Sequence, residues 1–182
     1  MKTFKKISYL LFLIISIHSC DEANDALNKI KTIDISNDFS ETITIDIPEL
    51  STTEQSFSEI TTIDIASNEQ IQENLDLIED VTINTITYEI SNFTGSENAI
   101  VEKASIDFND TSINISDINL KNADDNNTIF TIDDTSILNT ISSILQDNTE
   151  IDVTLTGVIN TSPVVFDITF NVDTTVAVET TL

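Results

Sequence analysis

The chain has 182 residues, 32 of them acidic against only 7 lysines and arginines, which gives a formal net charge of −25. A negative field of this strength repels phosphates, so nucleic acid is excluded as a partner. The two glycines, Gly95 and Gly157, form no glycine-rich phosphate loop, so we expect no nucleotide either.

The chain begins with a signal-peptide pattern. Lys2, Lys5 and Lys6 precede an apolar run of eleven residues, 7–17. A helix of that length rises about 16 Å, roughly half of the ~30 Å hydrocarbon core of a bilayer. We therefore expect residues 1–19 to be removed and not to span the membrane.

The apolar run ends in Ile17-His18-Ser19-Cys20, which resembles the lipobox of bacterial lipoproteins. The resemblance implies that the chain is cut before Cys20, that its sulfur is diacylated, and that its new amino group is usually acylated too. Two or three acyl chains, at ~0.8 kcal/mol per buried CH₂, hold a protein firmly on a membrane. The alternative is an ordinary secretory signal with an unrelated cysteine.

Asp21 and Glu22 follow the cysteine directly. Aspartate at this position resembles an inner-membrane retention signal of enteric lipoproteins, and a short acidic run resembles the surface-export signal of other Gram-negative bacteria. The Ile-, Asn- and Thr-rich composition favours the second. We expect lipid anchoring to the outer membrane, at its surface or periplasmic face, with residues 20–29 as a tether.

The processed chain lacks the residues of many enzyme classes. His18 lies in the signal and Cys20 carries the lipid, and each is the sole residue of its type. Ser-His-Asp triads, Cys-His pairs and His/Cys metal sites are therefore excluded. We predict a protein that is not an enzyme and has no catalytic, metal-binding or cofactor-binding residues.

Period-two alternation of apolar residues predicts strands from residue 30 onward. The first strand contains Ile33 and Ile35, and the second runs from Ile43 to Ile47 and is closed by Pro48. A third strand, led by Phe57 and Ile60, ends at Ile65.

A helix is predicted over residues 68–79, because Ile71, Leu75 and Ile78 lie on one helical face behind Ser67 or Asn68 as a cap. Strand spacing resumes at residue 81. A phase slip at 84–85 predicts a bulge or turn that sends the following side chains to the other face.

The polar loop around Gly95 predicts a hairpin to a strand over 104–108, and short strands follow at 113–115 and 118–120. Residues 124–127 are predicted to be a loop and 130–132 a strand. Asp133 or Asp134 caps a second helix, whose apolar stripe is the best in the chain: Ile137, Leu138, Ile141, Ile144 and Leu145. Alternation at 151–159 and 166–172 around Ser162-Pro163 predicts a final hairpin.

These elements predict one β-rich domain over residues 30–182, mainly β or α+β. We expect an antiparallel β-sandwich or two-layer sheet with two short amphipathic helices. Residues 60–108 and 129–172 share the order strand, helix, strand, strand, which suggests an internal βαββ duplication; chance similarity in an Ile/Thr-rich chain is the alternative. The aromatic residues are expected in the core: Tyr88, Phe93, Phe108, Phe130, Phe166 and Phe170.

Acidic residues gather at 107–110, 117, 124–127 and 133–134. They could supply oxygen ligands for calcium, but their spacing does not fit an EF-hand, and solvated turns and helix caps are the preferred interpretation. We predict a non-catalytic interaction or structural module of the cell envelope that contacts the membrane through its lipid and binds a protein or glycan partner. The alternatives are an apolar-ligand (lipid) carrier and a carboxylate-only hydrolase.

Overall fold

The computed structural model describes residues 31–109 and 111–180. Asp34–Val178 form one compact unit, and residues 31–33 and 179–180, the outer ends of the first and last strands, fall in a separate unit. The predicted signal, Cys20 and the tether lie outside the described residues.

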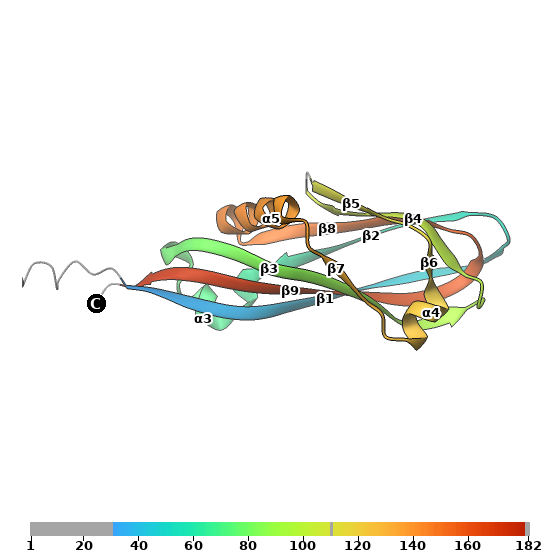
Figure 1. Ribbon diagram of the computed structural model, residues 1–182, viewed down its shortest axis with the longest axis horizontal. Coiled ribbons are helices and arrows are strands. Elements are labelled where there is room, and N and C mark those ends of the chain that lie inside the picture. Colours follow the sequence, from blue (N-terminus) through green and yellow to red (C-terminus); the bar gives the residue numbers. More distant parts are fainter. Residues whose placement is uncertain (1–30, 110, 181–182) are drawn as a thin grey trace, which may run out of the picture. The chain divides into compact units, whose positions relative to one another are not determined.

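Two antiparallel sheets build the unit Asp34–Val178. Sheet A has the strand order β1-β9-β3-β7, formed by β1 (Lys31–Ser51), β9 (Ser162–Thr180), β3 (Ile78–Gly95) and β7 (Ile129–Ile132). Sheet B has the order β2-β8-β4-β5, formed by β2 (Gln55–Asp64), β8 (Glu150–Ile159), β4 (Ile100–Phe108) and β5 (Thr111–Ile115), with the short β6 (Ile118–Asn119) paired to β4. Figure 1 shows the two layers. The predicted β-sandwich is confirmed.

The strand order defines a jelly roll. β1 lies beside β9, β2 beside β8, β3 beside β7 and β4 beside β5. These nested antiparallel pairs correspond to one long hairpin that folds back on itself. The folding makes β3 pair with β9 and β4 pair with β8. The result is the double-sheet, Greek-key arrangement of jelly rolls.

The core lies between the sheets. Phe108, Phe166 and Phe170 are fully buried there with a set of isoleucines and valines. Tyr88 is also buried, stacks on Phe130 with ring centroids 4.8 Å apart, and has its pKa raised to about 12 by burial. The aromatic core is confirmed, with Phe93 and Phe130 only partly buried.

The second predicted helix is confirmed as α5 (Thr135–Asn148). The Asp134 carboxylate accepts hydrogen bonds from the amides of Ser136 and Ile137, and Ile141 and Leu145 are buried. Gln146 donates a 2.6 Å hydrogen bond to the Glu79 carbonyl, so α5 packs along the part of β3 that precedes its pairing with β7.

The first predicted helix is much shorter than expected. α3 spans only Glu69–Gln72 and is capped by Asn68, one of the two predicted caps. A 3₁₀ turn covers Leu75–Leu77, and β3 begins at Ile78. Ile71 is buried, but Leu75 is 38% exposed. So short a helical stripe does not sustain a helix, and the long strand that follows takes Ile78 instead.

The predicted strand over 118–120, the predicted loop over 124–127 and the division of the N-terminal strand are wrong. Asn119 caps an unpredicted helix, α4 (Leu120–Asp125), which includes half of the predicted 124–127 loop and ends the expected strand at Asn119. The two expected N-terminal strands are one strand, β1. Pro48 lies within it because an edge strand tolerates a missing N–H donor.

Both predicted hairpins are wrong in their pairing. β3 and β4 lie in different sheets, as do β8 and β9, so each turn crosses from one sheet to the other. The phase slip at 84–85 is a bulge, as predicted. The side chains after it were expected to turn to the other face, and they do not. The bulge takes up the extra residue, so Ile83 and Ile86 are both buried on the same side.

The proposed duplication stays a prediction. β2, α3, β3 and β4 match β7, α5, β8 and β9 in order, but corresponding strands lie in opposite sheets and the helices differ in length, 4 residues against 14.

Candidate functional site

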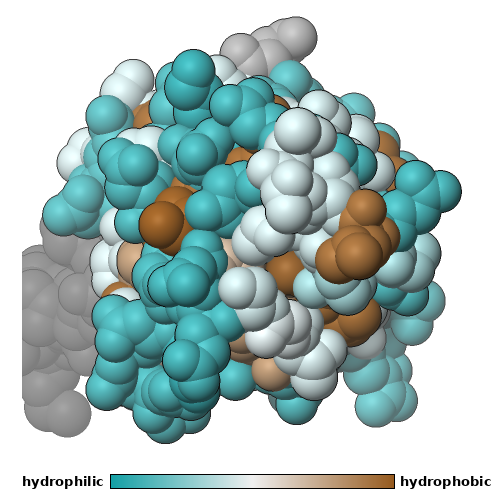
Figure 2. Space-filling view, turned by 90° about the vertical axis from the view of Figure 1, so that its right-hand side faces the viewer, coloured by the Kyte–Doolittle hydropathy of each residue, from teal (hydrophilic) through white to brown (hydrophobic). Residues whose placement is uncertain are grey.

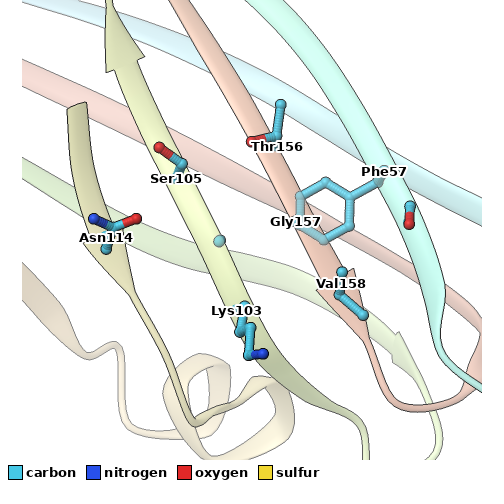
Figure 3. A pocket seen from close by; sticks show the side chains of 9 residues that line it. Phe57, Lys103, Ser105, Asn114, Thr156, Gly157 and Val158 are labelled. Carbon is cyan, nitrogen blue, oxygen red and sulfur yellow. The ribbon is translucent and has the colours of Figure 1, made fainter. Parts of the chain in front are cut away.

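The outer face of sheet B carries a depression of about 360 Å³ across four strands. Its lining comes from β2, β4, β5 and β8: Ser56, Phe57, Lys103, Ala104, Ser105, Asn114, Thr156, Gly157 and Val158. Figure 3 shows Lys103 and Ser105 on β4, between Asn114 on one side and Thr156 and Val158 on the other.

A β-bulge places Lys103 on this face. Val101 and Ala104 are both buried although they are three residues apart, and the register shifts between Val101 and Lys103. The bulge therefore leaves two residues, Glu102 and Lys103, between successive inward-facing side chains. Bulges are frequent beside binding sites because they redirect a side chain locally.

The strand register aligns polar side chains across the face. Ser58 is opposite Thr156, Thr156 is opposite Ser105, and Ser105 is opposite Asn114. Neighbouring strands are about 4.8 Å apart, so these three hydroxyls and one amide form a continuous row. In the adjacent row Ser56 and Lys103 flank Val158.

Two small residues form the floor of the depression. Ala104 and Gly157 are paired, and the Phe57 ring occupies the inner side of Gly157, where an added Cβ would be 2.3 Å from a ring carbon. The ring is held at its other side by an edge contact with Phe166, with centroids 6.2 Å apart. The packing of the core therefore fixes the shape of the outer surface here.

The depression has a different charge from the rest of the chain. None of the described residues that line it is acidic. Lys121 forms an ion pair with Asp125 at 2.9 Å, whereas Lys103 has no ion pair among the side chains that the structure describes. An ammonium group, hydroxyls and an amide can donate and accept several hydrogen bonds at once.

The outer face of sheet A is also polar, and hydrogen bonds join its side chains across three strands. Thr44 donates a 2.6 Å hydrogen bond to Asp167, and Asn92 donates a 2.8 Å bond to the same carboxylate. These two bonds lower the pKa of Asp167. Asn84 similarly bridges Asp173 and Thr175, so this face is a ladder that ties β1, β9 and β3 together.

Several of the acidic residues considered for calcium have structural roles. Asp134 caps α5, Asp124 accepts a 3.3 Å bond from the Phe93 amide, and Asp107 accepts from the Ser105 hydroxyl. No three His, Cys, Asp or Glu side chains converge on a metal-sized space in the described ranges.

Exposed apolar side chains are scattered over several elements: Ile33, Leu50, Ile60, Leu75, Leu77 and Ile129. Figure 2 shows one face on which hydrophilic residues predominate and hydrophobic ones form small separate spots. Single exposed apolar residues are normal in soluble domains. Within the described residues, no helix is both long and apolar enough to cross a bilayer.

The sequence did not predict Lys103, Ser105, Asn114 or Thr156 as site residues. One signal was present, because Val101, Ala104 and Ile106 break the period of two at Lys103. The residues opposite Lys103 depend on which strands are neighbours, and alternation does not specify that.

No protein-family model matches the chain, and no curated protein matches it. Among solved structures, it is similar to the decameric BFDV capsid protein at 9% identity, over 79% of this chain and 99% of that one, with a TM-score of 0.45. It is similar to Desmodium yellow mottle tymovirus at 13% identity, over 82% and 90% of the two chains, with a TM-score of 0.40. It is similar to turnip yellow mosaic virus at 9% identity, over 85% of this chain and 96% of that one, with a TM-score of 0.28. Strand order alone supports the jelly roll here.

Proposed function

We propose that this protein is a non-catalytic binding module of the bacterial cell envelope, anchored in the outer membrane by lipid on Cys20. The signal pattern, the lipobox-like sequence and the acidic residues after Cys20 support this location. The polar residues 21–29 would link the anchor to the sandwich.

The ligand that fits the Lys103 depression best is a neutral glycan. The observation that carries this proposal is a lysine without an ion pair in the described chain, surrounded by serine, threonine and asparagine side chains and by no acidic lining residue. Sugar hydroxyls and ring oxygens can accept from the ammonium and exchange hydrogen bonds with the hydroxyl row. The net charge of −25 disfavours polyanionic glycans.

The anchor is tested by labelling cells with an alkyne-bearing fatty acid and purifying the protein. We expect the label on the native chain and none on a Cys20→Ala variant, which should also retain residues 1–19 or leave the membrane fraction. Equal labelling of both chains, or of neither, would remove the lipid from the account.

Glycan binding is tested by calorimetry with neutral hexasaccharides of glucose, mannose and N-acetylglucosamine, and with hexagalacturonate as the anionic comparison. A shallow site without an exposed aromatic ring should bind on the order of a millimolar, about −4 kcal/mol. Lys103→Ala should weaken binding about fivefold, the loss of ~1 kcal/mol for one hydrogen-bonding group.

Lys121→Ala is the matched control, because that lysine lies on α4 and pairs with Asp125. It should leave binding unchanged. The proposal is wrong if no neutral sugar binds, if hexagalacturonate binds better, or if the two lysine variants behave alike.

A further inference from the structure

The sandwich is closed along one side and open along the other. On the closed side, the Ser142 hydroxyl of α5 accepts a 3.0 Å hydrogen bond from the Ile83 amide, β7 pairs with residues 86–89 of β3, and Asp124 of α4 accepts from Phe93. Two helices and a strand thus cover successive parts of β3. The edges at the opposite side are β1 and β2.

β2 is a long and regular edge strand. It has ten residues in continuous register with β8, without a bulge, and it pairs with β8 alone among the described strands. Every second residue of such a strand points its N–H and C=O away from its partner. Its sequence, QSFSEITTID, contains neither lysine nor proline, two of the residues that protect an edge. Its one inward-facing charge is Glu59, which is opposite the buried Leu155.

A groove of about 370 Å³ runs between β1 and β2. Its lining combines apolar residues, Ile45, Ile47 and Phe57, with the acidic residues Asp46, Glu49 and Glu59. Ile60, on the outer face of β2 beside the groove, is 62% exposed. A strand added to β2 would place alternate side chains in the groove and over Ile60.

The charge of the groove selects the occupant. A second copy of this chain would bring its own acidic edge against Glu59, and like charges facing each other across strands are destabilising. Lysine or arginine side chains would instead complement the three carboxylates. We propose that β2 accepts an extended, lysine- or arginine-bearing peptide segment of a protein partner as an additional antiparallel or parallel strand, seated over the β1–β2 groove.

The test uses the full chain in nonionic detergent and a fluorescent nine-residue probe, acetyl-KVTVKVTVK-amide, followed by anisotropy. Two comparison peptides separate charge from strand pairing. One replaces each lysine with glutamate, and the other keeps the lysines but is N-methylated at consecutive central residues, so that neither of its edges can donate hydrogen bonds there.

We expect the lysine probe to bind and each comparison peptide to bind at least about tenfold more weakly, as expected when ~1.4 kcal/mol is lost. Glu59→Gln should weaken the lysine probe about two- to fivefold, because one exposed ion pair contributes up to ~1 kcal/mol. Glu59→Lys should weaken it further. Glu89→Gln, which removes the same charge from β3 in the other sheet, should have no effect.

Five results would overturn the proposal. The lysine probe could fail to bind, it could bind no better than the glutamate peptide, or Glu59 and Glu89 variants could behave alike. Equal binding of the N-methylated peptide would show electrostatic attraction without strand addition. Sedimentation that reveals a dimer abolished by Glu59→Lys would make a second copy of the chain the occupant, and would also overturn it.

Discussion

At the scale of single residues, Gly157 links the core to the candidate site. Its missing side chain leaves room for the Phe57 ring on the inner face, and its pairing with Ala104 forms the floor of the depression outside. One position therefore serves packing and surface shape together.

Gly157→Ala should lower the free energy of unfolding by about 1–3 kcal/mol, because the new Cβ would lie 2.3 Å from a Phe57 ring carbon and force the ring to move. Urea denaturation measures the loss. Phe57→Leu/Gly157→Ala should lose less than the sum of the two single variants, since the smaller side chain removes the clash. Strict additivity would contradict this account of the contact.

Some single residues are predictable from the sequence and others are not. The sequence predicts Ser67 or Asn68 as one helix cap and Asp133 or Asp134 as the other. In the structure Asn68 and Asp134 accept the backbone hydrogen bonds. Lys103 was not recognised, because an exposed lysine in a strand has no pattern of its own. Its importance arises from Ser105, Asn114 and Thr156, which reach it through other strands.

At the scale of elements, α5 is the clearest case of a structure specified locally. Its cap and its apolar stripe are both encoded within residues 134–145. The helix covers part of the edge of β3, so its stability contributes to keeping that edge protected.

Asp134→Ala should destabilise the protein by about 1 kcal/mol, the usual cost of removing an N-cap side chain. Asp133→Ala is the matched control, because this substitution removes the same charge one residue away. The amides of Ser136 and Ile137 donate to the Asp134 carboxylate. Thermal unfolding of both variants checks the difference. Equal losses would assign the effect to charge and not to capping.

Elements also explain the wrong hairpins. Alternation places β3, β4, β8 and β9 with one face toward a core, and that part was correct. It does not say whether two consecutive strands share a sheet or face each other across the core. In a jelly roll both strands flanking a turn are buried on one face, so the sequence pattern is the same in either case.

At the scale of the whole molecule, charge decides the behaviour in solution. The 32 acidic residues are opposed by 7 basic ones, and in the described chain the ion pair is that of Lys121 with Asp125. Self-repulsion opposes the compact state and is screened over ~8 Å at physiological ionic strength.

Sodium chloride should therefore raise the melting temperature gradually between low and physiological ionic strength. Calcium chloride at matched ionic strength should raise it by a similar amount, because Asp134 caps a helix and Asp124 and Asp107 accept hydrogen bonds within the fold. Differential scanning calorimetry with both salts checks this. A saturating stabilisation by calcium alone would reveal a specific site instead.

The Lys103 depression and the β1–β2 groove carry opposite charges. The Lys103 depression offers a cation among neutral hydrogen-bonding groups, whereas the β1–β2 groove offers carboxylates beside an open edge. Both lie on a jelly roll whose topology brings distant strands together, and a lipid on Cys20 would hold both outside the cytoplasm.

The most direct test of the central claim is to map amide chemical shifts of the ¹⁵N-labelled protein while a neutral hexasaccharide is added. The account predicts that saturable shifts concentrate at Lys103, Ser105, Asn114 and Thr156, and that Lys103→Ala raises the sugar concentration at half-saturation about fivefold. Shifts that are absent, or that centre on Thr44, Asp167 and Asn92 of the opposite sheet, would contradict it.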